Sequence, residues 1–297
     1  MNLNKISKHW GKQFKRMRAD NHYWLNNEII NQHVQVLMTG EKRHWLEWLL
    51  NSYFKNKKFK SSLSICCGDG DHEKVLSSSG KIDFVHGVDI SSAALEIANN
   101  KFKTEKTNES SYLFEVMDVN KINPECFSRK YDLVFSIGSL HHIESLENVI
   151  ETIKEVLDKD AYFIIVEYIG PKKFQWEDGQ LEVINNILKV LSFKYKKNFA
   201  PSVLERPTLE EMDRIDPSEA VRSNEIYEML KNNFDVEYER MFNGTIIHRL
   251  FPFLNLKKSK QQYLELIINM AIALESDLIL NKKLKSDFVF MILKNKI

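Results

Sequence analysis

A short apolar segment that runs into a glycine turn constrains the possible folds of this chain most strongly. Residues 61–67 read Ser-Ser-Leu-Ser-Ile-Cys-Cys, as in a buried strand, and Gly68-Asp69-Gly70 follows at once. Glycine has no Cβ, so the backbone of such a turn can approach a ligand closely. A second predicted strand, over 84–90, reaches the carboxylate of Asp89 at its end. A glycine turn after one strand and an acid after the next are typical of nucleoside binding, in which the acid accepts hydrogen bonds from ribose hydroxyls.

Strands continue to alternate with helices after this pair, and the strands are almost continuously apolar. Further strands are predicted over 112–118, 131–136, 161–167, 234–241 and 287–293, with helices at 91–98, 146–157 and 261–280. Apolar strands that alternate with helices indicate a sheet covered on both faces. We therefore predict an α/β fold with a doubly wound, mainly parallel sheet of seven strands, of which the last is antiparallel.

Four segments are expected around this sheet. They are an N-terminal helical cap (1–58), the core (59–169), a helical insertion on the substrate side (170–233), and the last two strands with their helix (234–297). The insertion exceeds the roughly 2–6 residues of ordinary connections in such folds, so we expect it to cover the carboxyl edge of the sheet. Within it, Pro217 is interpreted as the first turn of a helix. The basic stretch 54–60 is interpreted as a solvated loop.

Composition excludes several classes of function. The 297 residues carry 42 Lys and Arg against 41 Asp and Glu, a net charge of +1, which disfavours nucleic acid as a partner. The three cysteines, two of them adjacent, make no disulfide framework and indicate a reducing, cytoplasmic setting. The N-terminus has no apolar core of signal-peptide length, and charges interrupt the apolar stretch 263–280, so no membrane span is expected. The helix over 264–280 could instead serve the core or a homodimer interface.

With these features the chain resembles the class I S-adenosylmethionine-dependent methyltransferases over residues 61–167. In that family an apolar strand ends in a G-x-G-x-G turn, here Cys66-Cys67-Gly68-Asp69-Gly70. Cys66 stands in the place of the first glycine, and Ser64 replaces the acid often found just upstream. The resemblance implies S-adenosylmethionine as cofactor, with the turn beside its methionine half. It further implies that Asp89 binds the ribose hydroxyls, that Ile90 flanks the adenine, that Asp118 and Val119 meet the adenine amine, and that Ser136 begins the segment passing the reactive methyl.

The chemistry of the residues agrees with this resemblance. S-adenosylmethionine has no pyrophosphate, so it does not need the third glycine that a nicotinamide dehydrogenase uses, and which is missing here. Cys66 and Cys67 are interpreted as small buried groups rather than nucleophiles. No metal site is predicted. The motifs of enzymes that methylate DNA bases are also missing, since no Pro-Pro-aromatic sequence follows the strand 131–136 and Cys126 follows a glutamate.

Methyl transfer to a hydroxyl requires alignment of the nucleophile and a base to accept its proton. The candidate bases are His141, His142 and Glu167, with His248 as a more distant one. Residues predicted to contact the substrate are Tyr168, Phe174, Trp176 and Arg222. We predict O-methylation of a saccharide or another small-molecule hydroxyl. Two alternatives stay open: N-methylation of a small molecule or protein, and a catalytically silent binding protein with this fold.

Overall fold

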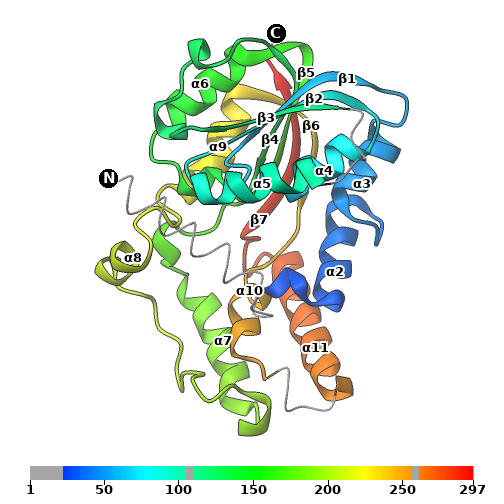
Figure 1. The fold of residues 1–297 in the computed structure, drawn as a ribbon. Helices are drawn as coiled ribbons and strands as arrows, with labels where there is room; N and C mark the ends of the chain where they lie inside the picture. The colour runs from blue at the N-terminus through cyan, green and yellow to red at the C-terminus, as the bar shows by residue number, and fades with distance from the viewer. Residues whose placement is uncertain (1–22, 105–109, 256–260, 297) are drawn as a thin grey trace.

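The computed structural model describes residues 23–104, 110–255 and 261–296. Its centre is a seven-stranded sheet in the order β3-β2-β1-β4-β5-β7-β6 (Figure 1). The strands are β1 (Phe59–Ile65), β2 (Ile82–Asp89), β3 (Ser111–Val116), β4 (Tyr131–Ile137), β5 (Leu157–Tyr168), β6 (Phe234–Met241) and β7 (Phe288–Asn295). Strand β7 pairs antiparallel with β5 and β6, whereas β1 to β5 pair in parallel. The predicted fold class is confirmed.

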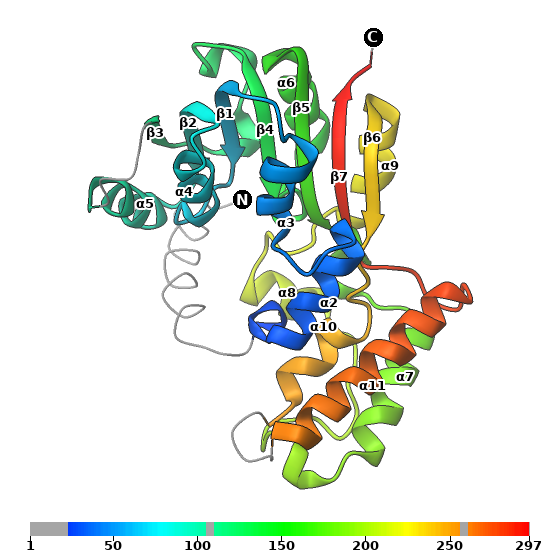
Figure 2. The same ribbon diagram turned by 90° about the vertical axis from the view of Figure 1, so that its right-hand side faces the viewer.

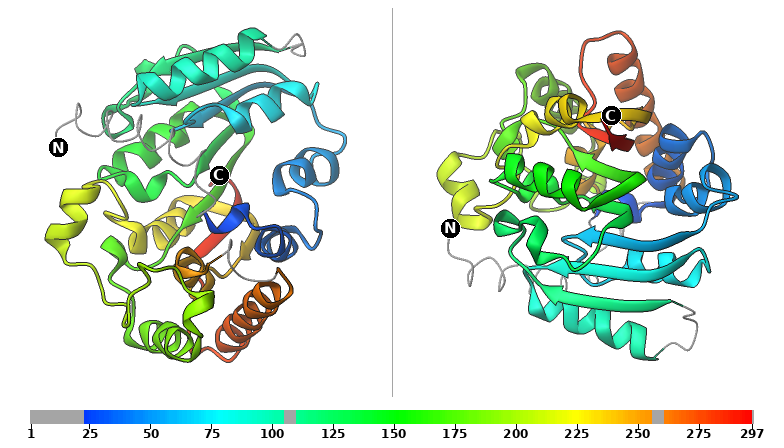
Figure 3. Two further views of the ribbon diagram at one scale, coloured as in Figure 1. Left: turned by 60° about the horizontal axis from the view of Figure 1, so that its bottom comes forward. Right: turned by 90° about the horizontal axis from the view of Figure 1, so that it is seen from above.

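Helices cover both faces of the sheet, because successive side chains of each strand point to opposite faces. In β4, Leu133 and Phe135 join one apolar cluster and Val134 joins the other. The first cluster includes residues of α3 (Trp45–Trp48) and α4 (Asp71–Ser78), and the second includes residues of α6 (Leu146–Val156) and α9 (Ser223–Asn233). Helix α5 (Ser92–Thr104) lies beside α4 (Figure 3).

A helical lobe lies below the carboxyl ends of the parallel strands (Figure 2). It contains α2 (Glu28–Thr39), α7 (Asp178–Val190), α10 (Ile247–Leu250) and α11 (Gln261–Leu280), with α8 (Leu209–Ile215) beside it. Buried residues of α7, α10 and α11, such as Ile184, Leu250 and Ile268, belong to the same apolar cluster as Phe135 in β4. The lobe therefore packs as a continuation of the core, and it covers the edge of the sheet at which ligands bind in folds of this kind.

Two local predictions are wrong. Residues 216–222 form a turn, and α9 begins only at Ser223, because Asp216 Oδ1 accepts hydrogen bonds from the backbone and hydroxyl of Ser218 at 2.9 and 2.6 Å. Helix α9 then packs with α6 on the sheet. The stretch 54–60 is not a fully solvated loop, since Phe54 and Phe59 are buried and β1 already begins at Phe59. Of the predicted N-terminal helical cap, residues 1–22 lie outside the described part of the chain.

Helix α11 presents one apolar face to the core and another to the surface. Leu264, Ile268 and Ala271 are buried, while Leu266 and Met270 are exposed. The homodimer interface therefore stays a prediction. In the described ranges, no helix has both the length and the apolar character required to cross a bilayer.

Candidate functional site

A cavity of about 1080 Å³ opens at the carboxyl ends of β1, β2 and β4. Strand β1 pairs with β2 on one side and with β4 on the other, so the direction of chain winding reverses at this point. Open α/β sheets bind their ligands at such a switch point. Of the residues singled out in the sequence, those that line the cavity are Ser64, Cys66, Cys67, Gly68, Asp69, Asp89, Ile90, Asp118, Val119, His141, His142, Glu167, Tyr168, Phe174 and His248.

Four of the predicted site residues do not line the cavity. Ser136 is fully buried, and its hydroxyl lies 2.6 Å from that of Ser139, which does line the cavity. A Cβ on Gly70, which has φ +76°, would lie 2.9 Å from the Cβ of Ala98, so this glycine is needed for helix packing. Trp176 is stacked on Phe174, with 5.6 Å between ring centroids. Arg222 forms ion pairs with Glu147 and Glu225 and thereby ties α9 to α6, which leaves it away from the cavity.

Positive φ angles occur along the glycine turn, at Cys66, Gly68 and Gly70. Cys66 has φ +51° and Gly68 has φ +59°, both in the left-handed region that glycine adopts most easily. Cys66 thus occupies the position of the missing glycine in a conformation that glycine would favour. Burial raises the pKa of the Cys66 and Cys67 thiols well above the ordinary value, which disfavours the thiolate that a nucleophilic role requires.

Asp89 closes β2 and holds the glycine turn against it. Its Oδ2 accepts a hydrogen bond from the N–H of Gly68 at 2.9 Å, and its Oδ1 accepts one from the N–H of Ser91 at 2.7 Å. Burial raises the pKa of Asp89, and these backbone donors act in the opposite direction. A carboxylate offers about four lone-pair positions, so Asp89 retains acceptor capacity for a ligand in the cavity.

Glu73 is a cavity residue that the sequence analysis missed. It lies in the first turn of α4, three residues after Gly70, and only 1% of its surface is exposed. Within the described residues, its buried Oε2 has no hydrogen-bond partner. Burial raises the pKa of Glu73 to about 7, and the side chain of Ser64 acts to lower it. One feature of the sequence could have identified Glu73 as a cavity residue. It is an acid in the first turn of a helix, where side chains point back toward the preceding loop.

Two of the candidate bases, His141 and Glu167, contact each other in the structure. Glu167 is fully buried at the end of β5, and its Oε2 accepts from the N–H groups of Ser139 and Leu140 at 2.9 and 2.6 Å. Its Oε1 accepts from the N–H of Tyr168 at 2.7 Å and pairs with Nδ1 of His141. Both oxygens of Glu167 therefore have partners, and this carboxylate is placed to orient His141. The base role predicted for Glu167 and for His141 stays a prediction.

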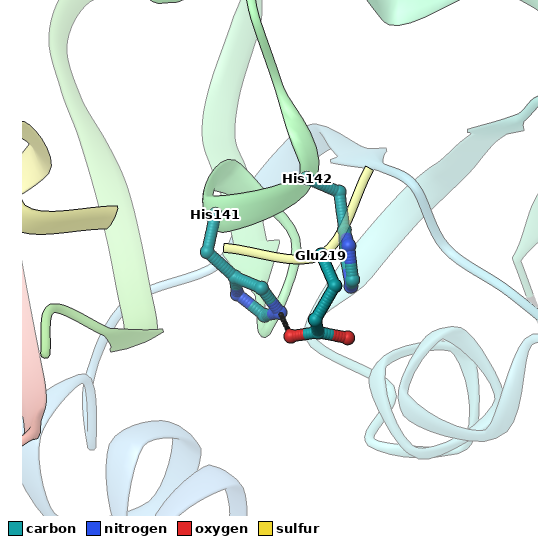
Figure 4. Close-up of side chains that lie close together, drawn as sticks. All are labelled: His141, His142 and Glu219. Atoms are coloured by element: carbon teal, nitrogen blue, oxygen red, sulfur yellow. Dashed lines mark ion pairs between the residues drawn. The ribbon is translucent and has the colours of Figure 1, made fainter. Parts of the chain in front are cut away.

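A second carboxylate, which the sequence analysis did not single out, faces the same histidine. Glu219 comes from the turn before α9, and its Oε1 lies 3.6 Å from Nε2 of His141 (Figure 4). Burial alone would lower the pKa of His141, but Glu167 and Glu219 raise it above the ordinary value. For His142, burial and the neighbouring charge of His141 lower the pKa. His142 Nδ1 lies 3.2 Å from the carbonyl oxygen of Ser218, to which it can donate.

Two further observations concern the histidines. One ligand atom from each of His141, His142 and Glu219 lies within 4.8 Å of the others, a spacing at which a metal ion could be held. His248, the distant candidate base, packs among aromatic rings, with centroids 5.2 Å from Phe288 and 5.5 Å from Trp24. Burial lowers its pKa well below the ordinary value, so His248 is a poor proton acceptor.

Comparison with known proteins shows the family to which the chain belongs. A family model described as a methyltransferase domain matches residues 56–234. Demethylmenaquinone methyltransferases of two Leptospira interrogans strains are 29% identical over 143 residues, which cover 44% of this chain and 56% of theirs. This chain therefore spans little more than half the length of these curated relatives.

Solved structures of S-adenosylmethionine-dependent methyltransferases are also similar in outline. One from Mesorhizobium loti has a TM-score of 0.48 and 12% identity, over 84% of this chain and 97% of that chain. Another from Clostridium acetobutylicum has a TM-score of 0.44 and 12% identity, over 85% and 91%. The matched range 56–234 contains Asp89, His141 and Glu167, whereas α10 and α11 lie beyond it.

Proposed function

Because this chain belongs to the methyltransferase-domain family, we propose that it transfers a methyl group from S-adenosylmethionine to a hydroxyl of a small molecule in the cavity. The observation that carries the choice of a hydroxyl is the buried pair of His141 and Glu167, in which Glu167 engages Nδ1 of a histidine that lines the cavity. A hydroxyl is poorly acidic and needs such a proton acceptor, whereas an amine needs less help. The same pair favours an enzyme over a silent binding protein.

The cavity residues fit the methyl donor chemically. Asp89 would accept hydrogen bonds from the ribose hydroxyls, and Asp118 with Val119 would border the adenine. The backbone at Gly68 would lie beside the methionine half. The unpartnered carboxylate oxygen of Glu73 fits the cationic amino group of that half, for which Ser64 offers no charge. The bound cofactor supplies an electrophilic methyl group on a sulfonium, with a neutral thioether as leaving group.

The proton is handled by this chain's own residues. His141 accepts the proton of the acceptor hydroxyl at Nε2, while Glu167 holds Nδ1–H and stabilises the charged ring. Glu219 adds a second negative charge on the other side of the imidazole. Glu167 and Glu219 are therefore positioning and electrostatic residues, and His141 is the catalytic one.

The cavity wall on the lobe side favours a substrate with ring faces. Its aromatic members include Trp24, Tyr168, Phe174, Phe242 and Phe288. Such rings can stack on the face of a sugar or of an aromatic metabolite. A hydroxyl of a saccharide or of a comparable metabolite is the acceptor that we propose.

The test is formation of S-adenosylhomocysteine from S-adenosylmethionine with three sets of acceptors: hydroxyl compounds including sugars and phenols, primary amines, and demethylmenaquinone. We expect turnover with a hydroxyl compound, and we expect it to survive EDTA. Turnover only with amines would replace the proposal by N-methylation. Tight binding of the cofactor without turnover on any acceptor would favour the silent binding protein.

Glu73→Gln is expected to weaken binding of S-adenosylhomocysteine by about tenfold, because a buried charge pair with the amino group is lost. Calorimetric titration of the purified variant measures this. 5′-Methylthioadenosine lacks the amino acid end, so it should bind the variant and the wild type equally. Glu96→Gln, an exposed carboxylate on α5, is the matched control. Unchanged affinity of Glu73→Gln for S-adenosylhomocysteine would refute this role.

Glu219→Gln is expected to shift the rising limb of the pH–rate profile to lower pH. His141 must be deprotonated to accept a proton, so turnover rises as pH passes its pKa, which Glu167 and Glu219 hold above the ordinary value. Removing the charge of Glu219 destabilises the protonated ring and lowers that pKa. Glu225→Gln, which affects the Arg222 ion pair away from the cavity, should leave the profile in place. If the rising limb of the pH–rate profile stays at the same pH or moves to higher pH in Glu219→Gln, the effect assigned to Glu219 on His141 is refuted.

A further inference from the structure

Arg249 places a positive charge in the wall of the cavity. It lies on α10, lines the cavity, and stacks over the ring of Trp176 at 4.1 Å and of Phe174 at 5.0 Å from the ring centroids. The two rings are nearly parallel, with an angle of 17° between them. Stacking of this kind orients a guanidinium while leaving its edge free to bind hydrogen-bond acceptors.

The helix that carries Arg249 is itself held in place. Glu275 of α11 is fully buried and accepts hydrogen bonds from the N–H groups of Gly244 and Ile247 at 3.4 and 3.1 Å. The first N–H groups of a helix have no acceptor within the helix. Glu275 supplies acceptors for such donors at the start of α10. Arg249 is thus presented from a fixed element rather than from a loose loop.

No counter-ion neutralises this charge in the described part of the chain. There, no carboxylate oxygen lies within 4.0 Å of the Arg249 guanidinium, and its buried Nε has no hydrogen-bond partner. Arg43, Arg206 and Arg222, in contrast, each form an ion pair with a carboxylate. Burial lowers the pKa of Arg249 to about 10, which leaves it cationic at neutral pH.

Two carboxylates influence Arg249 electrostatically without forming an ion pair with it. Glu219 and Asp287 act electrostatically on Arg249 and raise its pKa, but neither pairs with it. Glu219 faces His141 at 3.6 Å. Asp287 accepts a hydrogen bond from Gln180 at 3.1 Å, and burial raises its pKa to about 7. An unpaired, desolvated cation is costly, and an anionic ligand would offset that cost.

We propose that the methyl acceptor carries an oxyanion group, a carboxylate or a phosphate, and that Arg249 binds this group. The inference rests on the proposed function, since it concerns the same cavity. A guanidinium can bind either oxyanion through two parallel hydrogen bonds. The carboxylates of Glu167 and Glu219 repel an anion from the histidine side of the cavity. The substrate is therefore oriented with its acidic group at Arg249 and its reacting hydroxyl toward His141.

The test uses the whole 297-residue chain, saturated with S-adenosylhomocysteine and titrated with inorganic phosphate, with acetate and with acetamide. We expect phosphate or acetate to bind, and acetamide, which has the shape of acetate without the charge, not to bind. Arg249→Met should weaken the anion at least tenfold and leave binding of S-adenosylhomocysteine unchanged. Arg129→Met removes an arginine that stacks at 4.0 Å on the half-buried ring of Phe84, a residue that does not line the cavity, and it should have no effect.

The possible results distinguish a phosphate from a carboxylate, and failure of this inference from failure of the proposed function. If phosphate binds and acetate does not, the acidic group is a phosphate, and the reverse identifies a carboxylate. If neither anion binds the wild type better than Arg249→Met, or if acetate and acetamide both bind and do so with equal affinity, the inference is overturned. The acetamide comparison needs no variant and stays decisive if Arg249→Met does not fold. Failure of the wild type to bind S-adenosylhomocysteine would instead overturn the proposed function itself.

Discussion

Replacement of Asp89 by asparagine is expected to weaken binding of S-adenosylhomocysteine about a hundredfold. The carboxylate would accept hydrogen bonds from two ribose hydroxyls, and hydrogen bonds to a charged group contribute about 1.5–3 kcal/mol each. A loss of about 3 kcal/mol corresponds to a factor of about one hundred in the dissociation constant. Calorimetric titration of the folded variant measures the change directly.

Asp89 also holds the turn, and the experiment must separate the two roles. Its oxygens accept from the N–H groups of Gly68 and Ser91, so thermal unfolding of the ligand-free variant reports the structural loss. An analogue of the cofactor product without the 2′ and 3′ hydroxyls should bind the wild type and Asp89→Asn with similar affinity. Asp83→Asn removes an exposed carboxylate at the other end of the same strand and is the control. A folded Asp89→Asn that binds S-adenosylhomocysteine normally would remove the ribose assignment.

Replacement of His141 by alanine is expected to reduce kcat by about 10²–10⁴-fold, the usual contribution of a general base. Binding of S-adenosylhomocysteine should change little, because His141 serves the acceptor side of the cavity. His142→Ala should lower kcat much less, since burial and the charge of His141 depress the pKa of His142 and its Nδ1 can donate to Ser218. Steady-state kinetics with the acceptor found in the panel give both numbers.

Chemical rescue distinguishes a lost proton acceptor from a damaged site. Added imidazole should restore part of the turnover of His141→Ala, and the restored rate should rise with pH through the pKa of free imidazole. Rates equal to the wild type in both histidine variants would leave no histidine base in this loop. Equal losses in both, without rescue, would indicate a structural role for the pair.

The strands could be predicted because their signals are local. Residues 234–241 were predicted as a strand and form β6 with the same bounds, since alternating side chains along a strand are visible in the sequence. The glycine turn and Asp89 lie where two strands of a parallel sheet end, and such ends meet at one edge. Their convergence in the cavity therefore followed from the order of elements alone.

Errors occurred where a distant or polar contact competes with a local preference. Pro217 suits a first helical turn, but the hydrogen bonds from Ser218 to Asp216 form a separate turn instead. Arg222 was predicted to contact the substrate, but in the structure it forms an ion pair with Glu147, which is remote in sequence. No periodicity in the sequence could have revealed either partner.

By itself, the sequence determined the sheet, the glycine turn and the positions of Asp89, Asp118 and His141, because strand periodicity and turn chemistry act over a few residues. Only the tertiary structure decided that Glu167 contacts His141, that Glu73 and Glu219 line the cavity, and that Arg249 lines it without a counter-ion among the residues that the structure describes. These properties depend on burial and on charges brought together from distant parts of the chain, and electrostatic energy is set by distance in space rather than in sequence.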